Sequence, residues 1–342
     1  MNGENIRHDW IDYLRFIAIF YIYLGHFGPA AGKLYPFVFT FHVPLFFFIS
    51  GLLVKRARTN NDLISAIVKS FKRIMIPYAV FSVIGVIFLA IKDQRSSQNI
   101  FQMIEMSIYG VRNNTPLATL WFFPCLFMVY SYYNVLYRFI NSRVLLFVLG
   151  LVIYTLTPVW FGKAIPSLFW NIDSAWYFFV FFAAGALLSP HLNSEIKFYD
   201  NNKKKSCLYL FALMSIIYYA VCYQYGTFSF YKGIKSLEMR YFIYFFAAVF
   251  LFIPSILLAK YLDYKSKHFD IKPLLVLGRN TLVLCGTEQI LKFTIVASAG
   301  IFGIKLAPHN PLEAILLTSL CFFVSYFTTI KWYYFFSNKT LQ

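Results

Sequence analysis

The sequence predicts an all-helical membrane protein in which about ten transmembrane helices form a single domain over residues 1–342. Composition is the first reason, because 59% of the residues are hydrophobic, only 13% are charged, and the mean hydropathy is +0.61. Soluble domains carry about a quarter of their residues as charged side chains, so a water-soluble globule is excluded. The apolar runs are also long enough to cross a bilayer, and they lack the strict alternation of membrane β-strands. The polar intervals between them are too short to hold a second hydrophobic core.

The predicted spans follow the apolar runs in order along the chain. Each run is taken as a helix, because lipid accepts only helices and closed barrels, in which every backbone hydrogen bond is made internally. Leu, Ile and aromatic residues fill whole runs without a dyad repeat, which favours helices over barrel strands. The spans are 10–28, 36–54, 74–91, 117–137, 144–161, 174–189, 206–224, 241–259, 280–299 and 312–336.

Basic residues predict the orientation of these helices. With the N-terminus in the cytoplasm, roughly twice as many Lys and Arg residues fall on cytoplasmic segments as on external ones. The positive-inside rule therefore places both termini in the cytoplasm. The formal net charge of +17 then follows from topology and from attraction to anionic lipids, so no nucleic-acid partner is expected.

The first predicted span carries a charged and a titratable residue on one helical face. His26 follows Arg15 by eleven residues, which returns it to within roughly 20° of the same azimuth and places it about 16 Å further along the axis. Asp12 lies on the same stripe and can pair with Arg15 at i, i+3. Such residues are costly inside a membrane, so they suggest function. The structural alternative is a pair of interfacial anchors and a hydrogen-bonded histidine at the outer boundary.

Four further segments carry distinctive sequences. The second span reads Phe-His-Val-Pro-Leu-Phe-Phe-Phe-Ile-Ser-Gly over 41–51, and Lys-Ser-Phe-Lys-Arg-Ile-Met-Ile-Pro-Tyr follows over 69–78. The fourth span opens with Leu-Trp-Phe-Phe at 120–123, and Leu-Gly-Arg-Asn-Thr-Leu at 277–282 begins the ninth. Together with the Arg15 to His26 spacing, and in this order, these segments resemble the acyltransferase 3 family of membrane proteins. The resemblance covers nearly the whole chain.

The resemblance implies an enzyme that transfers an acyl group, usually acetyl from cytoplasmic acetyl-CoA, to a hydroxyl of a glycan at or beyond the outer face. CoA is rich in phosphate, so its site should be cationic and open to the cytoplasm. Arg15 together with Lys69, Lys72 and Arg73 is the expected phosphate site. The competing explanation for this basic loop is the positive-inside rule alone. The family commonly has two arginines three residues apart here, whereas this chain has two lysines before its single arginine.

His26 is the expected catalytic residue, with Arg15 and Asp12 beside it on the same helix. A sugar hydroxyl is too weakly acidic to attack a thioester unaided, and imidazole is the side chain that accepts a proton near neutral pH. A covalent acyl-histidine intermediate is the alternative to direct transfer, and the sequence does not distinguish the two.

Three residues are expected to contact the acceptor substrate, namely His42, Trp121 and Glu288. His42 stands in the first turn of a helix, two residues before a proline, so a structural role at the outer boundary is its alternative. Trp121 lies near an outer boundary, where its ring is a candidate to hold a sugar. Glu288 stands four residues before Lys292, so it either orients His26 or the acceptor, or forms a neutralising pair with the lysine. The family often has a histidine close to the position of Glu288.

The sequence therefore predicts a multi-pass O-acyltransferase in a bacterial cell membrane, with acetyl as the expected acyl group. Acyl-CoA is the expected donor substrate, and no permanently bound cofactor is expected. The expected partners are acyl-CoA, a glycan acceptor and membrane lipids, with other proteins of polysaccharide synthesis as further candidates. The five cysteines stand singly without metal-ligand spacing, so no metal site is expected. The alternative is an exporter of a polysaccharide or of its lipid-linked precursor, which leaves the Arg15 to His26 spacing unexplained.

Overall fold

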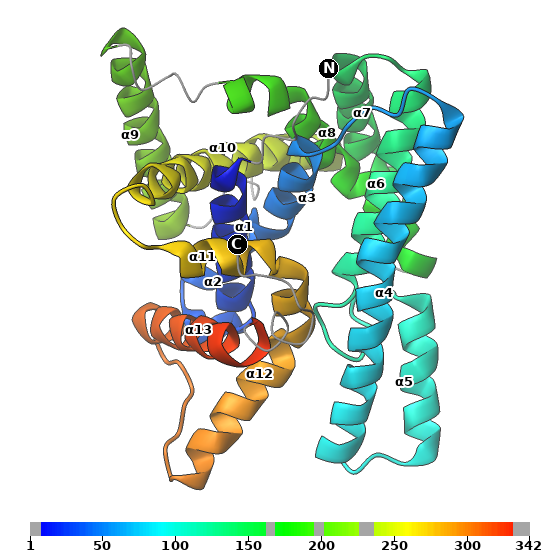
Figure 1. Ribbon diagram of the computed structural model, residues 1–342, viewed down its shortest axis with the longest axis vertical. Coiled ribbons are helices and arrows are strands. Elements are labelled where there is room, and N and C mark those ends of the chain that lie inside the picture. Colours follow the sequence, from blue (N-terminus) through cyan, green and yellow to red (C-terminus); the bar gives the residue numbers. More distant parts are fainter. Residues whose placement is uncertain (1–7, 162–167, 195–201, 226–235, 331–342) are drawn as a thin grey trace.

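The computed structural model describes residues 8–161, 168–194, 202–225 and 236–330, and every regular element within these ranges is a helix (Figure 1). The all-helical prediction is confirmed for these residues. Short 3-10 turns at Gly28–Ala31 and Phe169–Asn171 and a π-helical turn at Tyr326–Ile330 accompany the α-helices. The α-helices are α1 (Asp9–Gly25), α2 (Leu34–Phe39), α3 (His42–Leu52), α4 (Asn60–Lys92), α5 (Ser97–Tyr109), α6 (Phe122–Phe139), α7 (Arg143–Phe161), α8 (Ile172–Ser194), α9 (Asn202–Tyr225), α10 (Leu237–Lys265), α11 (Lys272–Arg279), α12 (Thr281–Ile301) and α13 (Pro311–Ser325).

Within the described ranges, six helical segments are long and apolar enough to cross a membrane. They are Leu34–Leu52, Asn60–Lys92, Phe169–Leu192, Glu238–Lys265, Thr281–Ile301 and Pro311–Thr328. Each of them overlaps one of the ten predicted spans. The other four predicted spans coincide with α1, α6, α7 and α9, whose described residues do not meet the same criteria of length and apolarity, although Arg143–Thr157 of α7 forms a shorter apolar helix. A polytopic membrane protein is therefore supported, while the count of ten and the orientation of the termini stay predictions.

Helix α4 begins earlier than the sequence predicted. The expected span started at residue 74, whereas α4 begins at Asn60 and continues through the basic run. Its start is a capping box in which the Asp62 backbone N–H donates to the Thr59 hydroxyl (3.0 Å) and the Thr59 N–H donates to the Asp62 carboxylate (2.9 Å). The charges interrupt the apolar pattern without ending the helix, because this part of α4 is exposed.

Helix α5 occupies an interval that the sequence predicted as a polar connection. It packs along the second half of α4, and the two helices form a hairpin at one edge of the molecule (Figure 1). Ser96 caps its start by accepting from the Asn99 backbone N–H (3.4 Å), and Gly110 ends it in the left-handed conformation (φ 63°). These two end signals are present in the sequence and would have predicted the helix.

Helix α1 lies within the bundle, where it contacts α3, α10, α11 and α12 (Figure 1). Helix α3 packs chiefly on α8, which also contacts α6 and α7. Large aromatic side chains fill the space between these helices, and Trp10, Tyr13 and Tyr23 of α1 are almost fully buried. Polar groups on α1 therefore face other helices on most sides, where each needs a partner.

The contact between α3 and α8 depends on a pair of glycines. A Cβ added at Gly51 of α3 would lie 1.9 Å from the carbonyl oxygen of Phe182, and one added at Gly185 of α8 would lie 2.0 Å from that of Phe48. Neither position has room for any larger residue, so each backbone packs directly on the other. Ser50-Gly51 in the sequence is thus a packing element.

The contact between α1 and α11 has the same basis. A Cβ added at Gly278 would lie 1.8 Å from the carbonyl oxygen of Asp12. Glycine at this position lets the short helix α11 lie against the backbone of α1. The next residue, Arg279, is thereby brought to the first turns of α1.

We expect Gly51→Ala to lower the stability of the detergent-purified protein by about 2 kcal/mol, because the added methyl group forces α3 and α8 apart. Alanine is the better helix former by about 1 kcal/mol, so local propensity acts in the opposite direction. Gly300→Ala on α12 is the matched control, since a Cβ there meets no atom within 4 Å. Thermal unfolding monitored by tryptophan fluorescence measures both, and equal midpoints would contradict this packing.

Candidate active site

The end of α1 brings His26 to a buried carboxylate on α12. Helix α1 ends at Gly25, and the His26 backbone N–H donates to the carbonyl oxygen of Ile22 (3.0 Å). The His26 Nδ1 lies 2.6 Å from Glu288 Oε2. The Glu288 side chain has no exposed surface, whereas that of His26 is 25% exposed. An ionised carboxylate only accepts hydrogen bonds, so Nδ1 carries the proton in this pair and Nε2 is the basic nitrogen.

The second oxygen of the same carboxylate faces a lysine. Glu288 Oε1 lies 2.6 Å from the Nζ of Lys292, one turn further along α12. The sequence left open whether Glu288 orients His26 or pairs with Lys292, and the structure contains both contacts. The carboxylate thus bridges a histidine after α1 and a lysine on α12.

Three arginines from three helices line a cavity of about 160 Å³. They are Arg15 of α1, Arg73 of α4 and Arg279 of α11. Ser50 of α3 lines the same cavity, and its hydroxyl donates to the carbonyl oxygen of Phe46 (2.9 Å). Arginines from separate helices that line one cavity make it a candidate site for an anion with several oxygens, such as a phosphate or a carboxylate.

The arginine-lined cavity extends toward the histidine. Ile22 of α1 and Cys285 of α12 also line it. Ile22 precedes His26 by one helical turn, and Cys285 precedes Glu288 by about one turn. An anionic group held by the arginines and a reacting group at His26 would therefore lie along the same two helices.

A buried carboxylate holds two of the arginines in place. Asp12 accepts from Arg15 Nη1 (2.9 Å) and from Arg279 Nε (3.3 Å), and Asp9 accepts from Arg279 Nη2 (3.1 Å). Asp12 is only 2% exposed. The i, i+3 pair expected from the sequence is present, and Asp12 acts through the arginines that it positions.

The structure separates the basic residues that the sequence grouped together. Lys69, Lys72 and Arg73 are all exposed on α4, but of the three only Arg73 lines the cavity with Arg15. Arg279 lines the cavity as well, although the sequence marked it only as part of the 277–282 segment and assigned it no role in the site. Its partner Asp12 stands 267 residues earlier, so no local spacing could reveal the pair.

His42 and Trp121, both expected at the acceptor site, are largely buried. His42 is 3% exposed, its Nδ1 lies 2.7 Å from the carbonyl oxygen of Val38, and it lies close enough to His26 for an electrostatic interaction. Trp121 is 7% exposed, and the Arg112 guanidinium carbon lies 4.7 Å from its ring centroid. These contacts place Trp121 beside a cation, and they give His42 a structural hydrogen bond.

The connection between α5 and α6 is attached to α12 beside the buried carboxylate. The Thr119 hydroxyl donates to the carbonyl oxygen of Cys285 (2.7 Å), and the Ala118 N–H donates to Gln289 Oε1 (2.9 Å). The two acceptor residues, Cys285 and Gln289, lie on either side of Glu288 in α12. The segment that ends in Trp121 is therefore held next to the His26–Glu288 pair.

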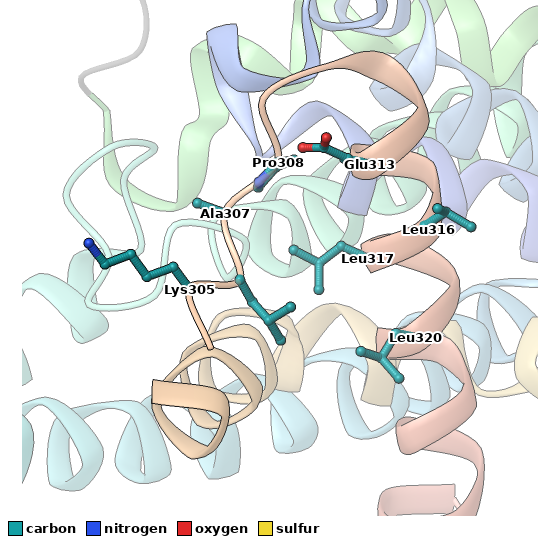
Figure 2. A pocket seen from close by; sticks show the side chains of 8 residues that line it. Lys305, Ala307, Pro308, Glu313, Leu316, Leu317 and Leu320 are labelled. Carbon is teal, nitrogen blue, oxygen red and sulfur yellow. The ribbon is translucent and has the colours of Figure 1, made fainter. Parts of the chain in front are cut away.

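A second cavity, of about 290 Å³, lies between α13 and the connection that precedes it (Figure 2). Leu316, Leu317 and Leu320 of α13 line it together with Lys305 and Glu313. It shares no lining residue with the arginine-lined cavity. Separately, the described residues contain no cluster of three or more His, Cys, Asp or Glu side chains that could hold a metal ion.

The fold and this site define a helical membrane protein that combines an arginine-lined cavity with a partly exposed histidine on a buried carboxylate. The sequence profile of the acyltransferase domain of acyltransferase 3 proteins matches residues 8–330. The chain therefore belongs to the acyltransferase 3 family, as its motifs predicted, and membership supports acyltransferase activity. No curated protein and no solved structure matches the chain.

Proposed function

We propose that the protein is an O-acyltransferase that moves an acyl group, with acetyl the preferred candidate, from cytoplasmic acyl-CoA to a hydroxyl of a surface or exported polysaccharide. The observation that carries the proposal is the arrangement of the arginine-lined cavity and the His26–Glu288 pair along α1 and α12. Family membership supports the acyl transfer. The location that fits this reaction is the bacterial cytoplasmic membrane, with the N-terminus inside.

The arginines are the proposed contacts for the donor. Arg15, Arg73 and Arg279 would bind the phosphates of acyl-CoA through bidentate, charge-assisted hydrogen bonds. Lys69 and Lys72 lie outside the cavity on exposed turns of α4, where they would attract the anionic donor at longer range. Arg15 and His26 are about 16 Å apart along the helix, and the long pantetheine arm of CoA can cover that distance.

His26 is the proposed general base. Its Nε2 takes the proton from the sugar hydroxyl while the hydroxyl oxygen attacks the thioester carbonyl carbon. The carbon–sulfur bond then breaks, CoA leaves as the thiolate, and the imidazolium returns the proton to that sulfur. Glu288 holds the ring by its Nδ1–H and stabilises the positive charge that forms on it. An acyl-histidine intermediate would use the same Nε2, and it would appear as trapped acyl-protein when acceptor is withheld.

The acceptor is proposed to lie beside Trp121 and His42. Trp121 offers an aromatic ring, and Arg112 beside it offers hydrogen-bond donors. Arg112 and Trp121 both lie on the connection between α5 and α6, and this connection is attached to α12 next to Glu288. Membrane lipids and other proteins of polysaccharide synthesis are the further proposed partners.

We expect membranes that contain the protein to transfer label from radiolabelled acetyl-CoA to the cell's surface polysaccharide. His26→Ala should slow this transfer by at least about 100-fold, which is the lower range for a positioned general base. His309→Ala, at an exposed histidine far along the chain, is the control. Full transfer by His26→Ala would contradict the catalytic role. Movement of glycan without any transferred label would instead favour an exporter.

We expect Arg73→Met to raise the KM for acetyl-CoA about tenfold with little change in kcat, because the lost contact stabilises the bound donor and the transition state alike. Arg58→Met is the matched control, since Arg58 is exposed just before α4 and does not line the cavity. Initial rates at varied acetyl-CoA separate the two parameters. Equal effects of the two substitutions would show that general positive charge, and not the cavity, attracts the donor.

A further inference from the structure

We propose that Lys292 is a positioning residue that fixes Glu288 against His26 and balances its charge, so that His26 enters the reaction as a neutral base. The inference rests on the proposed role of His26 as the base. The sequence alone offered only a neutralising i, i+4 pair on α12, and the contacts of the lysine extend well beyond that pair.

The ammonium group of Lys292 contacts a carboxylate, a backbone carbonyl oxygen and an aromatic ring. It lies 2.6 Å from Glu288 Oε1, it donates to the carbonyl oxygen of Tyr23 (2.6 Å), and it lies 4.0 Å from the ring centroid of Phe27. The side chain is 14% exposed. An ammonium group has N–H donors and no acceptor, so the carboxylate, the carbonyl oxygen and the ring face are all favourable neighbours.

Two of these partners flank His26 in the chain. The Tyr23 carbonyl belongs to the last turn of α1, where backbone oxygens lack partners within the helix, and Phe27 directly follows the histidine. A lysine at this position also complements the negative end of the helix dipole. Lys292 therefore contacts the end of α1 on both sides of His26, and on its own helix it contacts Glu288. By contacting both partners, the lysine fixes the distance between the His26 imidazole and the Glu288 carboxylate.

The charges around the pair give Lys292 an electrostatic role as well. Glu288 alone would favour the protonated form of His26, which cannot act as a base, and the lysine offsets this effect. Among the described residues, further titratable groups that interact electrostatically with Glu288 or with His26 include Tyr23 of α1, His42 of α3, Cys285 of α12 and Cys321 of α13. Arg112 is a cation that interacts with His42, whereas Lys292 is a cation in direct contact with the Glu288 carboxylate.

The test is the pH dependence of kcat for acetyl transfer in Lys292→Met. Without the ammonium group, Glu288 stabilises the imidazolium more strongly, so His26 stays protonated to higher pH. We expect the acidic limb of the profile to move to higher pH by about one unit, with a roughly tenfold lower plateau. Lys292→Arg keeps the charge, so its acidic limb should stay at the wild-type position even if its plateau falls.

Lys92→Met is the matched control. Lys92 contacts a carboxylate, that of Asp93 (3.1 Å), and lies 4.9 Å from the Phe293 ring centroid, but its side chain is 33% exposed. Its substitution should leave both the plateau and the limb unchanged.

A second pair of variants covers the case in which Lys292→Met does not fold because it leaves a buried charge unpaired. Glu288→Gln and the double variant Glu288→Gln/Lys292→Met differ only by the lysine charge. The acidic limb of the double variant should lie at higher pH than that of Glu288→Gln.

A uniform loss of rate without any displacement of the limb, in either background, would overturn the proposal and reduce Lys292 to a packing residue. Retention of full rate by His26→Ala is a different result, because it would remove the proposed base itself.

Discussion

The buried charge of Glu288 is the constraint on which the rest of the site depends. A carboxylate without exposed surface inside a membrane bundle is costly unless cations or hydrogen-bond donors surround it. Its two oxygens are divided between His26 and Lys292, and Lys292 in turn binds the last turn of α1. The requirement to satisfy one charge therefore joins α1 to α12, and it orients the imidazole in the process. The orientation of the His26 ring thus follows from the burial of the Glu288 carboxylate.

The same helix also determines where the other half of the site lies. Asp12 and Arg15 stand in the first two turns of α1, and Gly278 lets α11 approach closely enough for Arg279 to reach Asp12. The first turns of α1 are thereby held by ionic contacts, and its last turn is held by the hydrogen bond from Lys292. Because the helical rise is fixed, the separation of about 16 Å between Arg15 and His26 is a property of α1 alone. In the proposed reaction this is the separation between the donor phosphates and the reacting carbonyl.

Local pattern predicted the helical membrane class, the polar face of α1 and the family, because each apolar run and each motif on which these predictions rest lies within one short segment. It did not predict α5 or the early start of α4, since capping residues and not apolar runs mark their ends. Local pattern did not predict that Arg279 lines the cavity, and it did not decide whether Glu288 contacts His26 or Lys292. Both depend on contacts between α1 and helices more than 250 residues later, as the 262-residue separation of His26 and Glu288 illustrates. The packing of distant helices determines such pairs, and the spacing of residues within one helix contains no information about that packing.

In the proposed reaction Glu288 acts through His26, and a double-mutant cycle on the rate of acetyl transfer tests this dependence most directly. Glu288→Gln preserves the shape of the side chain and removes its charge. We expect this substitution to slow transfer by roughly 10-fold to 100-fold in the native background and to have almost no further effect in His26→Ala. Equal factors in the two backgrounds would mean that the carboxylate and the histidine act independently, and would contradict this dependence.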